Sequence, residues 1–240
     1  MAFDPSKFTT QEPKAIPLIL LLDVSGSMYG EKIDALNQAV QEMIQELRSA
    51  EKMELRYKVA IITFGDVAHL HRSLCDVQDL DFTPMQADGS TPMGGALSKA
   101  KEIIENKEMI KGRDYRPAVV LVSDGIPTDN WEHPLESFIN EGRSAKCQRL
   151  GLYIGNEGAG VNVLKRFIEG QENPLFYANN AKEITAAIRL ITMSQTQRTV
   201  SKNPNEPIKA IEVVQEDPTK RALIGYDGNL KYLLEYHPGK

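Results

Sequence analysis

Oxygen-bearing side chains follow a hydrophobic run in residues 18–28, LILLLDVSGSM. Asp23, Ser25 and Ser27 occupy alternate positions after five unbroken aliphatic residues. In a segment that turns, residues i, i+2 and i+4 can face the same side, and Gly26 lets the backbone bend between the two serines. Carboxylate and hydroxyl oxygens are the ligands that a hard divalent cation prefers. The segment is therefore a candidate metal-binding turn.

Two further clusters of oxygens stand in comparable places. Thr91 lies in Ser90-Thr91-Pro92, just before a predicted helix, and Asp124 follows the apolar run 117–123. In an open parallel sheet, ligands bind beyond the carboxyl ends of the strands, so all three clusters are expected at one edge. We predict that they bind Mg²⁺ or Mn²⁺ there, with a site made of Asp23, Ser25, Ser27, Thr91 and Asp124.

Strands and helices alternate along the chain. Continuous apolar runs are typical of strands covered on both faces, and apolar residues at helical spacing predict the helices between them. Strands are predicted over 16–24, 55–64, 67–74, 117–123, 149–154 and 174–178, and helices over 31–50, 94–110, 133–147, 161–169 and 181–195. This order predicts an α/β fold: a doubly wound, mostly parallel sheet with helices on both faces.

The composition changes after Gln195. We divide the chain into an N-terminal extension (1–15), one α/β domain (16–195) and a tail (196–240). The tail begins with a polar, proline-broken linker, TQRTVSKNPNEP, and continues with three short apolar segments. Asp227-Gly228-Asn229 between the last two predicts a β-hairpin, so the tail is expected to form a short C-terminal β extension.

The bulk composition excludes several classes of protein. The 28 Lys and Arg residues against 33 Asp and Glu residues give a formal charge of −5, and no basic stretch with interleaved aromatics predicts nucleic-acid binding. The first residues, MAFDPSKFTTQEPKA, do not resemble a secretory signal, and no apolar run approaches the roughly 20 residues that span a bilayer. Cys75 and Cys147 form no C-x-x-C motif. Two buried thiols in a reducing compartment, and hence a cytoplasmic protein, are expected.

The order and spacing of these oxygens resemble a known site. The D-x-S-x-S motif, a threonine 68 residues after Asp23 and an aspartate 33 residues after Thr91 are similar to the metal-ion-dependent adhesion site of von Willebrand factor A domains. The order of elements agrees with that family from about residue 15 to 195. Within the family, the segments SDGIPTD and STPMGGAL resemble the bacterial cytosolic TerY-like branch, which is linked to tellurium resistance.

The resemblance implies a division of labour among the five residues. Ser25, Ser27 and Thr91 would bind the metal through their hydroxyls, whereas Asp23 and Asp124 would act mostly through waters and hydrogen bonds. A partner protein's Glu or Asp would fill the open coordination position. The implied function is a non-catalytic interaction module. The TerY-like resemblance adds a stress-response setting with a kinase or a PP2C-type phosphatase as partner.

Two other functions remain open at this stage. The same site would suit an adaptor for a MoxR-type AAA+ ATPase, as other cytosolic A domains are. An enzyme, such as a Mg²⁺-dependent phosphohydrolase, is a third reading. Against it, G-x-S-x-G is absent around the serines, the three loops contain no histidine, and Asp23 has no second aspartate two residues later.

Large apolar side chains occur in the same loops. Exposed aromatics and methionines are enriched in protein interfaces, so these residues are candidates for partner contact. The alternative, which we weigh equally for each residue, is that the side chain points inward and anchors its loop. The candidates are Met28, Tyr29, Met93 and Trp131. His69 and His71 have no further zinc ligands nearby in sequence and are expected at the surface. GNEGAG at 155–160 matches no phosphate-loop pattern and is expected to be a connection.

Overall fold

The computed structural model describes residues 13–53, 55–155 and 158–208. Six strands form one sheet in the order β3-β2-β1-β4-β5-β6, with all neighbours parallel except β2 and β3. The strands are β1 (Lys14–Asp23), β2 (Leu55–Phe64), β3 (Ala68–Asp76), β4 (Ala118–Ser123), β5 (Gln148–Ile154) and β6 (Phe176–Ala178). The predicted α/β fold with a mostly parallel sheet is confirmed.

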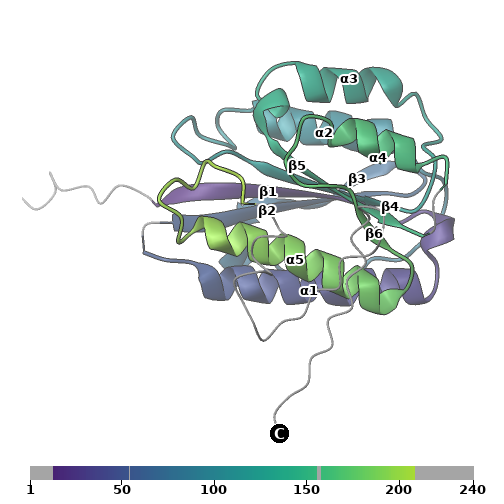
Figure 1. The fold of residues 1–240 in the computed structure, drawn as a ribbon, viewed down its shortest axis with the longest axis horizontal. Helices are drawn as coiled ribbons and strands as arrows, with labels where there is room; N and C mark the ends of the chain where they lie inside the picture. The colour runs from purple at the N-terminus through teal and green to yellow at the C-terminus, as the bar shows by residue number, and fades with distance from the viewer. Residues whose placement is uncertain (1–12, 54, 156–157, 209–240) are drawn as a thin grey trace, which may run out of the picture.

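Helices cover both faces of this sheet (Figure 1). The helices are α1 (Glu31–Ala50), α2 (Met93–Glu105), α3 (Glu132–Asn140), α4 (Val161–Phe167) and α5 (Ala181–Arg198), with short 3₁₀ turns η2 (Gly26–Met28), η3 (Val77–Asp79) and η4 (Ser144–Lys146). In Figure 1, α1 and α5 lie below the sheet, and α2, α3 and α4 lie above it. Two separate apolar cores result, one on each face.

Strand β1 is the centre of both cores. Alternate side chains of a strand point to opposite faces. Leu18 and Leu20 therefore join the core between the sheet and helices α1 and α5. Ile19 and Leu21 join the core between the sheet and helices α2, α3 and α4. Burial on both faces explains why the first strand is a continuous aliphatic run without alternation.

Two predicted helices end at least five residues earlier than expected. The helix predicted over 94–110 ends at Glu105, and the one predicted over 133–147 ends at Asn140. The side chain of Glu105, the last residue of α2, binds the chain just beyond the end of α3. Its Oε1 accepts hydrogen bonds from the backbone N–H of Arg143 (2.7 Å) and of Ser144 (3.1 Å). This long-range contact turns the chain into η4, and sequence periodicity does not reveal it.

Helix α5 extends beyond its predicted end at Gln195 to Arg198, whose side chain is buried. The guanidinium of Arg198 donates to Pro204 O (2.8 Å), Arg116 O (2.7 Å) and Gln195 Oε1 (3.1 Å). Burial lowers the pKa of Arg198 to about 10, which still leaves it charged near neutral pH. Residues 199–205, expected to be linker, thus fold back against the domain. The predicted hairpin and the N-terminal extension up to residue 12 lie outside the described residues.

The two thiols differ in environment. Both cysteines are free. Cys147 is fully buried, and burial raises the pKa of its thiol to about 12. Cys75 is only half-buried because it lies on the edge strand β3, so the expectation of two buried thiols holds for Cys147 alone. Among the helices of the described residues, none has the length and apolar character needed to cross a membrane.

The buried guanidinium of Arg198 leads to a stability prediction. Replacing it in Arg198→Met leaves one buried acceptor, Gln195 Oε1, and two partly buried carbonyl oxygens without their donor, so we expect the free energy of unfolding to fall by about 2–4 kcal/mol. Urea denaturation followed by circular dichroism measures this change. Arg189→Met on the same helix is the matched control, because Arg189 is exposed and lies 3.9 Å from Glu46. A change in Arg198→Met no larger than that of the control would contradict the prediction.

Candidate functional site

The candidate site begins at the last residue of β1. Asp23 is fully buried, yet both of its carboxylate oxygens have donors: Oδ1 accepts from Ser25 N (2.8 Å), and Oδ2 accepts from Ser123 Oγ (2.5 Å). Burial raises the pKa of Asp23, the hydrogen bonds from Ser123 and Ser25 oppose that shift, and the charge of Asp124 adds to it. Asp23 thereby joins the carboxyl end of β1 to that of β4.

The two serines point into a chain of hydrogen bonds. Ser25 Oγ lies 3.0 Å from Ser27 Oγ, and Ser27 Oγ donates to Asp124 Oδ1 (2.6 Å). The 3₁₀ turn η2 produces this arrangement, because its residues curl the backbone directly after β1. Ser25 is buried, whereas Ser27 is exposed. The structure therefore brings four of the five predicted residues into one network that opens to solvent at Ser27.

Thr91 approaches the same network from the third loop. Its Oγ1 lies 3.5 Å from the position that a Cβ on Gly125 would occupy, next to Asp124. The loop 124–131 holds Thr91 through its backbone, since Thr91 N donates to Thr128 Oγ1 (3.0 Å) and Thr91 O accepts from Thr128 N (3.0 Å). Within the part of the chain that the structure describes, Thr91 Oγ1 makes no hydrogen bond, which leaves it available to a ligand.

Lys32 was not predicted as a site residue, but its ammonium group binds two residues of the network. Its Nζ donates to Asp124 Oδ2 (2.6 Å) and to Ser27 O (3.0 Å). A lysine in the first turn of a helix opposes the helix dipole, so its place in α1 is the sequence signal that an acidic partner compensates it. The side chain of Asp124 is almost completely buried beneath this ammonium group.

Asp129 is a second residue that the sequence analysis missed. The first residues of α2 have no side-chain cap of their own. Asp129 supplies one from a distant loop, since its two carboxylate oxygens accept from Gly94 N (3.0 Å) and Gly95 N (2.9 Å). A Cβ on Gly94 would lie 2.8 Å from Trp131 Cα, so only glycine permits this close approach. Asp129 fixes the loop that carries Asp124 to the helix that follows Thr91.

The donor set fits a hard cation better than a softer metal. Among the described residues, no three His, Cys, Asp or Glu side chains are grouped as metal ligands, so a cation here would depend on hydroxyl oxygens. The carboxylate of Asp124 pairs with the ammonium group of Lys32. The cluster therefore already holds one cationic group beside the hydroxyls. Hydroxyl and carboxylate oxygens in such a setting are typical of Mg²⁺ sites.

Two of the four candidates for partner contact belong to the core. Met28 and Met93 are fully buried, each in one of the two apolar cores. Of the two alternatives that the sequence left open, partner contact is therefore wrong for Met28 and Met93, which are inward-facing anchors because η2 and the first turn of α2 direct these side chains inward. Tyr29 is 81% exposed, and Trp131 is half-buried and packs against the core of α2 and α3. Contact of Tyr29 and Trp131 with a partner stays a prediction.

The remaining motifs lie away from this network. His71 Nε2 lies 2.9 Å from Thr83 O, and burial lowers the pKa of His71, whereas His69 is exposed. Both histidines are on β3, at the edge of the sheet. The segment 155–160 joins β5 to α4, and residues 156–157 within it lie outside the described residues.

Residues 18–126 match the family model of the von Willebrand factor type A domain. This span includes the second half of β1, all of β2, β3 and β4, and all five predicted metal-site residues. Inter-alpha-trypsin inhibitor heavy chain H6 of Homo sapiens is 23% identical over 159 residues, which are 59% of this chain and 12% of that protein. An uncharacterized protein of Methanocaldococcus jannaschii is 29% identical over 133 residues, which are 52% of this chain and 28% of that protein.

Solved structures agree on the fold. A von Willebrand factor type A protein from Catenulispora acidiphila matches with a TM-score of 0.58 at 17% identity, over 75% of this chain and 42% of that one. The corresponding domain of the type V pili tip protein Mfa5 from Porphyromonas gingivalis gives 0.54 at 12% identity, over 75% of this chain and 94% of that one. At these identities the likeness concerns the fold alone, which is von Willebrand factor A-like. The curated relatives are much longer, and this chain spans only 12–28% of them.

The capping role of Asp129 is testable. Asp129→Asn removes the charge and one of two acceptors at the start of α2, so we expect the free energy of unfolding to fall by about 1–2 kcal/mol. Chemical denaturation measures this fall. Asp79→Asn removes the same charge from an exposed residue of η3 and should stay within about 0.5 kcal/mol of the wild type. Equal stabilities of the two variants would show that Asp129 does not cap α2.

Proposed function

We propose that this protein is a metal-dependent interaction module. In this proposal Mg²⁺ or Mn²⁺ is held at Asp23, Ser25, Ser27, Thr91 and Asp124, and an acidic residue of another protein binds to it. The observation that carries the proposal is the hydrogen-bonded chain from Ser25 through Ser27 to Asp124, beside a threonine hydroxyl that makes no hydrogen bond to any residue that the structure describes. The exposure of Ser27 leaves this chain open to a partner.

The five residues would have different roles. The hydroxyls of Ser25, Ser27 and Thr91 are candidate ligands, and Asp124 accepts the hydrogen bond that orients Ser27. Both oxygens of Asp23 are already occupied by donors, so Asp23 supports the turn without reaching a ligand directly. A bound cation would supply positive charge that neutral hydroxyls compensate poorly. A partner's carboxylate is the group that such a site would favour.

The exposed surface around the network fits a protein partner. Tyr29 and Ile126 are 81% and 55% exposed in the two loops that flank Ser27 and Asp124. Exposed aromatic side chains such as Tyr29 are enriched in the cores of protein interfaces. Trp131, which is half-buried, would contribute at the rim.

The resemblance of two loop segments to TerY-like proteins suggests a setting for this activity. We propose a scaffold in a cytoplasmic stress or tellurium-resistance system, with a kinase or a PP2C-type phosphatase among its partners. An adaptor for a MoxR-type AAA+ ATPase is the second candidate, because the same site serves both. The chromosomal neighbours of the gene would distinguish the two settings.

A phosphohydrolase is disfavoured by the geometry of Asp23. A nucleophilic aspartate needs a carboxylate oxygen that substrate can reach. Asp23 is fully buried and has donors on both oxygens. Within the described residues, the three loops of the network also contain no histidine to act as a base. The proposal is therefore binding and not catalysis.

Metal binding can be measured by calorimetry with Mg²⁺ on the metal-stripped protein. We expect weak binding by the wild type, because a partner must complete the shell, and no measurable heat from the Ser25→Ala plus Ser27→Ala double variant. Lys32→Met should bind Mg²⁺ about tenfold or more tightly, since it removes a positive charge that competes for Asp124. Lys32→Arg keeps the charge and is the control. Saturable binding that survives loss of both serine hydroxyls would contradict the proposed site.

Partner capture tests the function itself. Immobilised protein should retain its partner in Mg²⁺ and release it in EDTA, and Thr91→Ala should abolish capture. Thr91→Ser keeps the hydroxyl and should restore most of the binding. Mass spectrometry of the retained proteins identifies the partner. Capture that persists both in EDTA and in Thr91→Ala would place the contact surface elsewhere on the molecule.

A further inference from the structure

The ammonium group of Lys32 lies inside the network of the proposed metal site. Lys32 Nζ donates to Asp124 Oδ2 (2.6 Å) and to Ser27 O (3.0 Å), and Ser27 Oγ donates to Asp124 Oδ1 (2.6 Å). Each carboxylate oxygen of Asp124 therefore accepts a hydrogen bond, and one of the two donors is a cation. The chain itself thus supplies a positive charge to the carboxylate that orients Ser27.

Asp124 depends on this pair more than Lys32 does. The side chain of Asp124 is 2% exposed, whereas that of Lys32 is 38% exposed. A buried carboxylate that loses its charged partner is destabilised. The ammonium group of a lysine ends a flexible four-carbon chain, so it can turn to water without a change in the backbone. Asp124 therefore requires some cation beside it, but that cation does not have to be Lys32.

The backbone position of Lys32 does not favour the pair. Lys32 is the second residue of α1, where the positive end of the helix dipole repels a cation. Its bonds to Asp124 and to Ser27 O therefore hold the ammonium group in place against the dipole. Removal of the charge of Asp124 would leave little to keep it there.

A divalent cation at the proposed site would compete with this ammonium group. The hydroxyl of Ser27 is one of the candidate ligands, and the carbonyl of the same residue binds Lys32. Two cations that share one carboxylate repel each other, most strongly where water is excluded. Mg²⁺ carries twice the charge of an ammonium group and also accepts hydroxyl oxygens as ligands, so Asp124 would favour Mg²⁺ over Lys32.

We propose that Lys32 is a resident cation, meaning a charged group of the chain that a divalent metal ion displaces from Asp124. When the metal ion binds, it takes over the charge of Asp124, and the ammonium group turns to solvent. This inference rests on the proposed metal site and specifies how that site is regulated. Lys32 is a positioning residue: it holds Asp124 and Ser27 in place, and its displacement weakens metal binding until a partner completes the shell.

The experiment measures how fast each lysine of the full, metal-stripped chain reacts with an N-hydroxysuccinimide ester, by mass spectrometry of its peptides. Calorimetry on the same sample finds the Mg²⁺ concentration that saturates the protein. Reaction at this concentration is compared with reaction in NaCl of equal ionic strength, because salt alone weakens ion pairs. We expect Mg²⁺ to raise the rate at Lys32 by about threefold or more, since the ammonium group becomes free.

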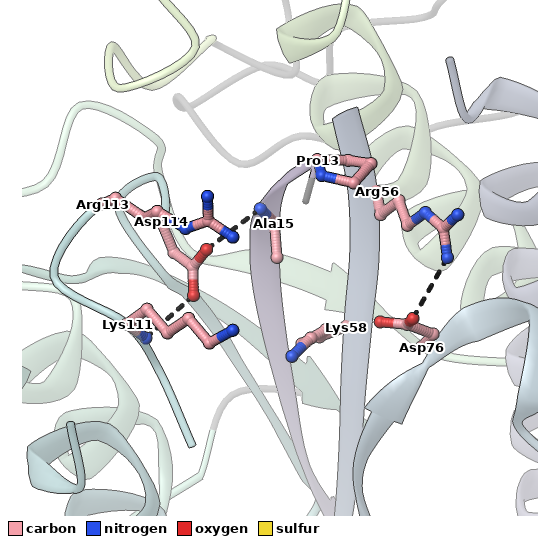
Figure 2. A pocket seen from close by; sticks show the side chains of 8 residues that line it. All are labelled: Pro13, Ala15, Arg56, Lys58, Asp76, Lys111, Arg113 and Asp114. Atoms are coloured by element: carbon pink, nitrogen blue, oxygen red, sulfur yellow. Dashed lines mark hydrogen bonds and ion pairs between the residues drawn. The ribbon is translucent and has the colours of Figure 1, made fainter. Parts of the chain in front are cut away.

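Two other lysines in the same sample are controls. Lys101 Nζ is also paired with a carboxylate, that of Glu141 at 3.3 Å, between α2 and α3. Lys58 is half-buried, as Lys32 is, but lines a separate cavity at the opposite ends of the strands (Figure 2). The rates at both should change by less than about 1.5-fold when Mg²⁺ replaces NaCl at equal ionic strength.

The outcomes separate this inference from the metal site itself. Heat from Mg²⁺ binding with an unchanged rate at Lys32 would overturn the inference and leave the proposed metal site in place. Absence of heat would overturn both. An increase at Lys32 no larger than that at Lys101 would also overturn the inference, because the effect would then be general to paired lysines.

Asp124→Asn tests the pair directly. The amide keeps the shape of the side chain without its charge, so Lys32 should react in NaCl as fast as it does in the wild type with Mg²⁺. Circular dichroism verifies that the variant is folded. A rate at Lys32 as low as in the wild type without Mg²⁺ would show that Asp124 does not hold the ammonium group, and would overturn the inference.

Thermal unfolding gives a second readout. Without Mg²⁺, Lys32→Met should unfold about 3–6 °C below the wild type, because Asp124 loses its partner. Mg²⁺ should raise the Tm of Lys32→Met by about twice as much as that of the wild type, since no ammonium group has to leave. Lys101→Met removes a paired lysine outside the site, and its response to Mg²⁺ should equal that of the wild type. Equal responses of the two variants would overturn the inference.

Discussion

The structure of the candidate site depends on one buried carboxylate. Asp23 ends the central strand at a point where no water reaches it, and burial alone would disfavour its charge. Its two hydrogen bonds, from Ser25 N and Ser123 Oγ, offset part of that cost and at the same time set the geometry. The first bends the chain so that Ser25 and Ser27 project from the strand end, and the second ties β1 to β4. The remaining oxygens of the network are placed relative to this anchor.

Hydrogen bonds that involve charged side chains hold the loops around Asp23 together. Lys32 from α1 reaches across to Asp124 in the loop after β4, and Asp129 from the same loop binds the start of α2. Three segments that are far apart in sequence are thus joined by charge-assisted hydrogen bonds, which are stronger than neutral ones. The same bonds bring the Thr91 hydroxyl to the network. A site built in this way is already arranged before any ligand arrives, which lowers the cost of binding.

The sequence predicted the fold and the five oxygen-bearing residues because both follow from local pattern. Apolar runs such as 18–22 mark the strands, and the polar residue that follows each run marks the strand's end. The parallel order then brings the carboxyl ends of the strands to one edge of the sheet. Lys32 and Asp129 were missed because their roles arise from contacts across more than thirty residues, which leave no periodic signal. The inward direction of Met28 and Met93 has the same origin: the turns that orient them are held by distant groups.

The parallel sheet also explains why the chain has two polar edges of opposite character. Every parallel strand runs the same way, so the carboxyl ends, with Asp23 and Asp124, gather on one side, and the amino ends, with Arg56 and Lys58, gather on the other. The apolar cores between them are fully buried and separate the two edges by the length of a strand. A ligand at one edge would therefore interact only weakly with a charge at the other, because that separation exceeds the screening length of physiological salt, about 8 Å. Coupling between the edges would require movement of β1 itself, which both cores hold in place.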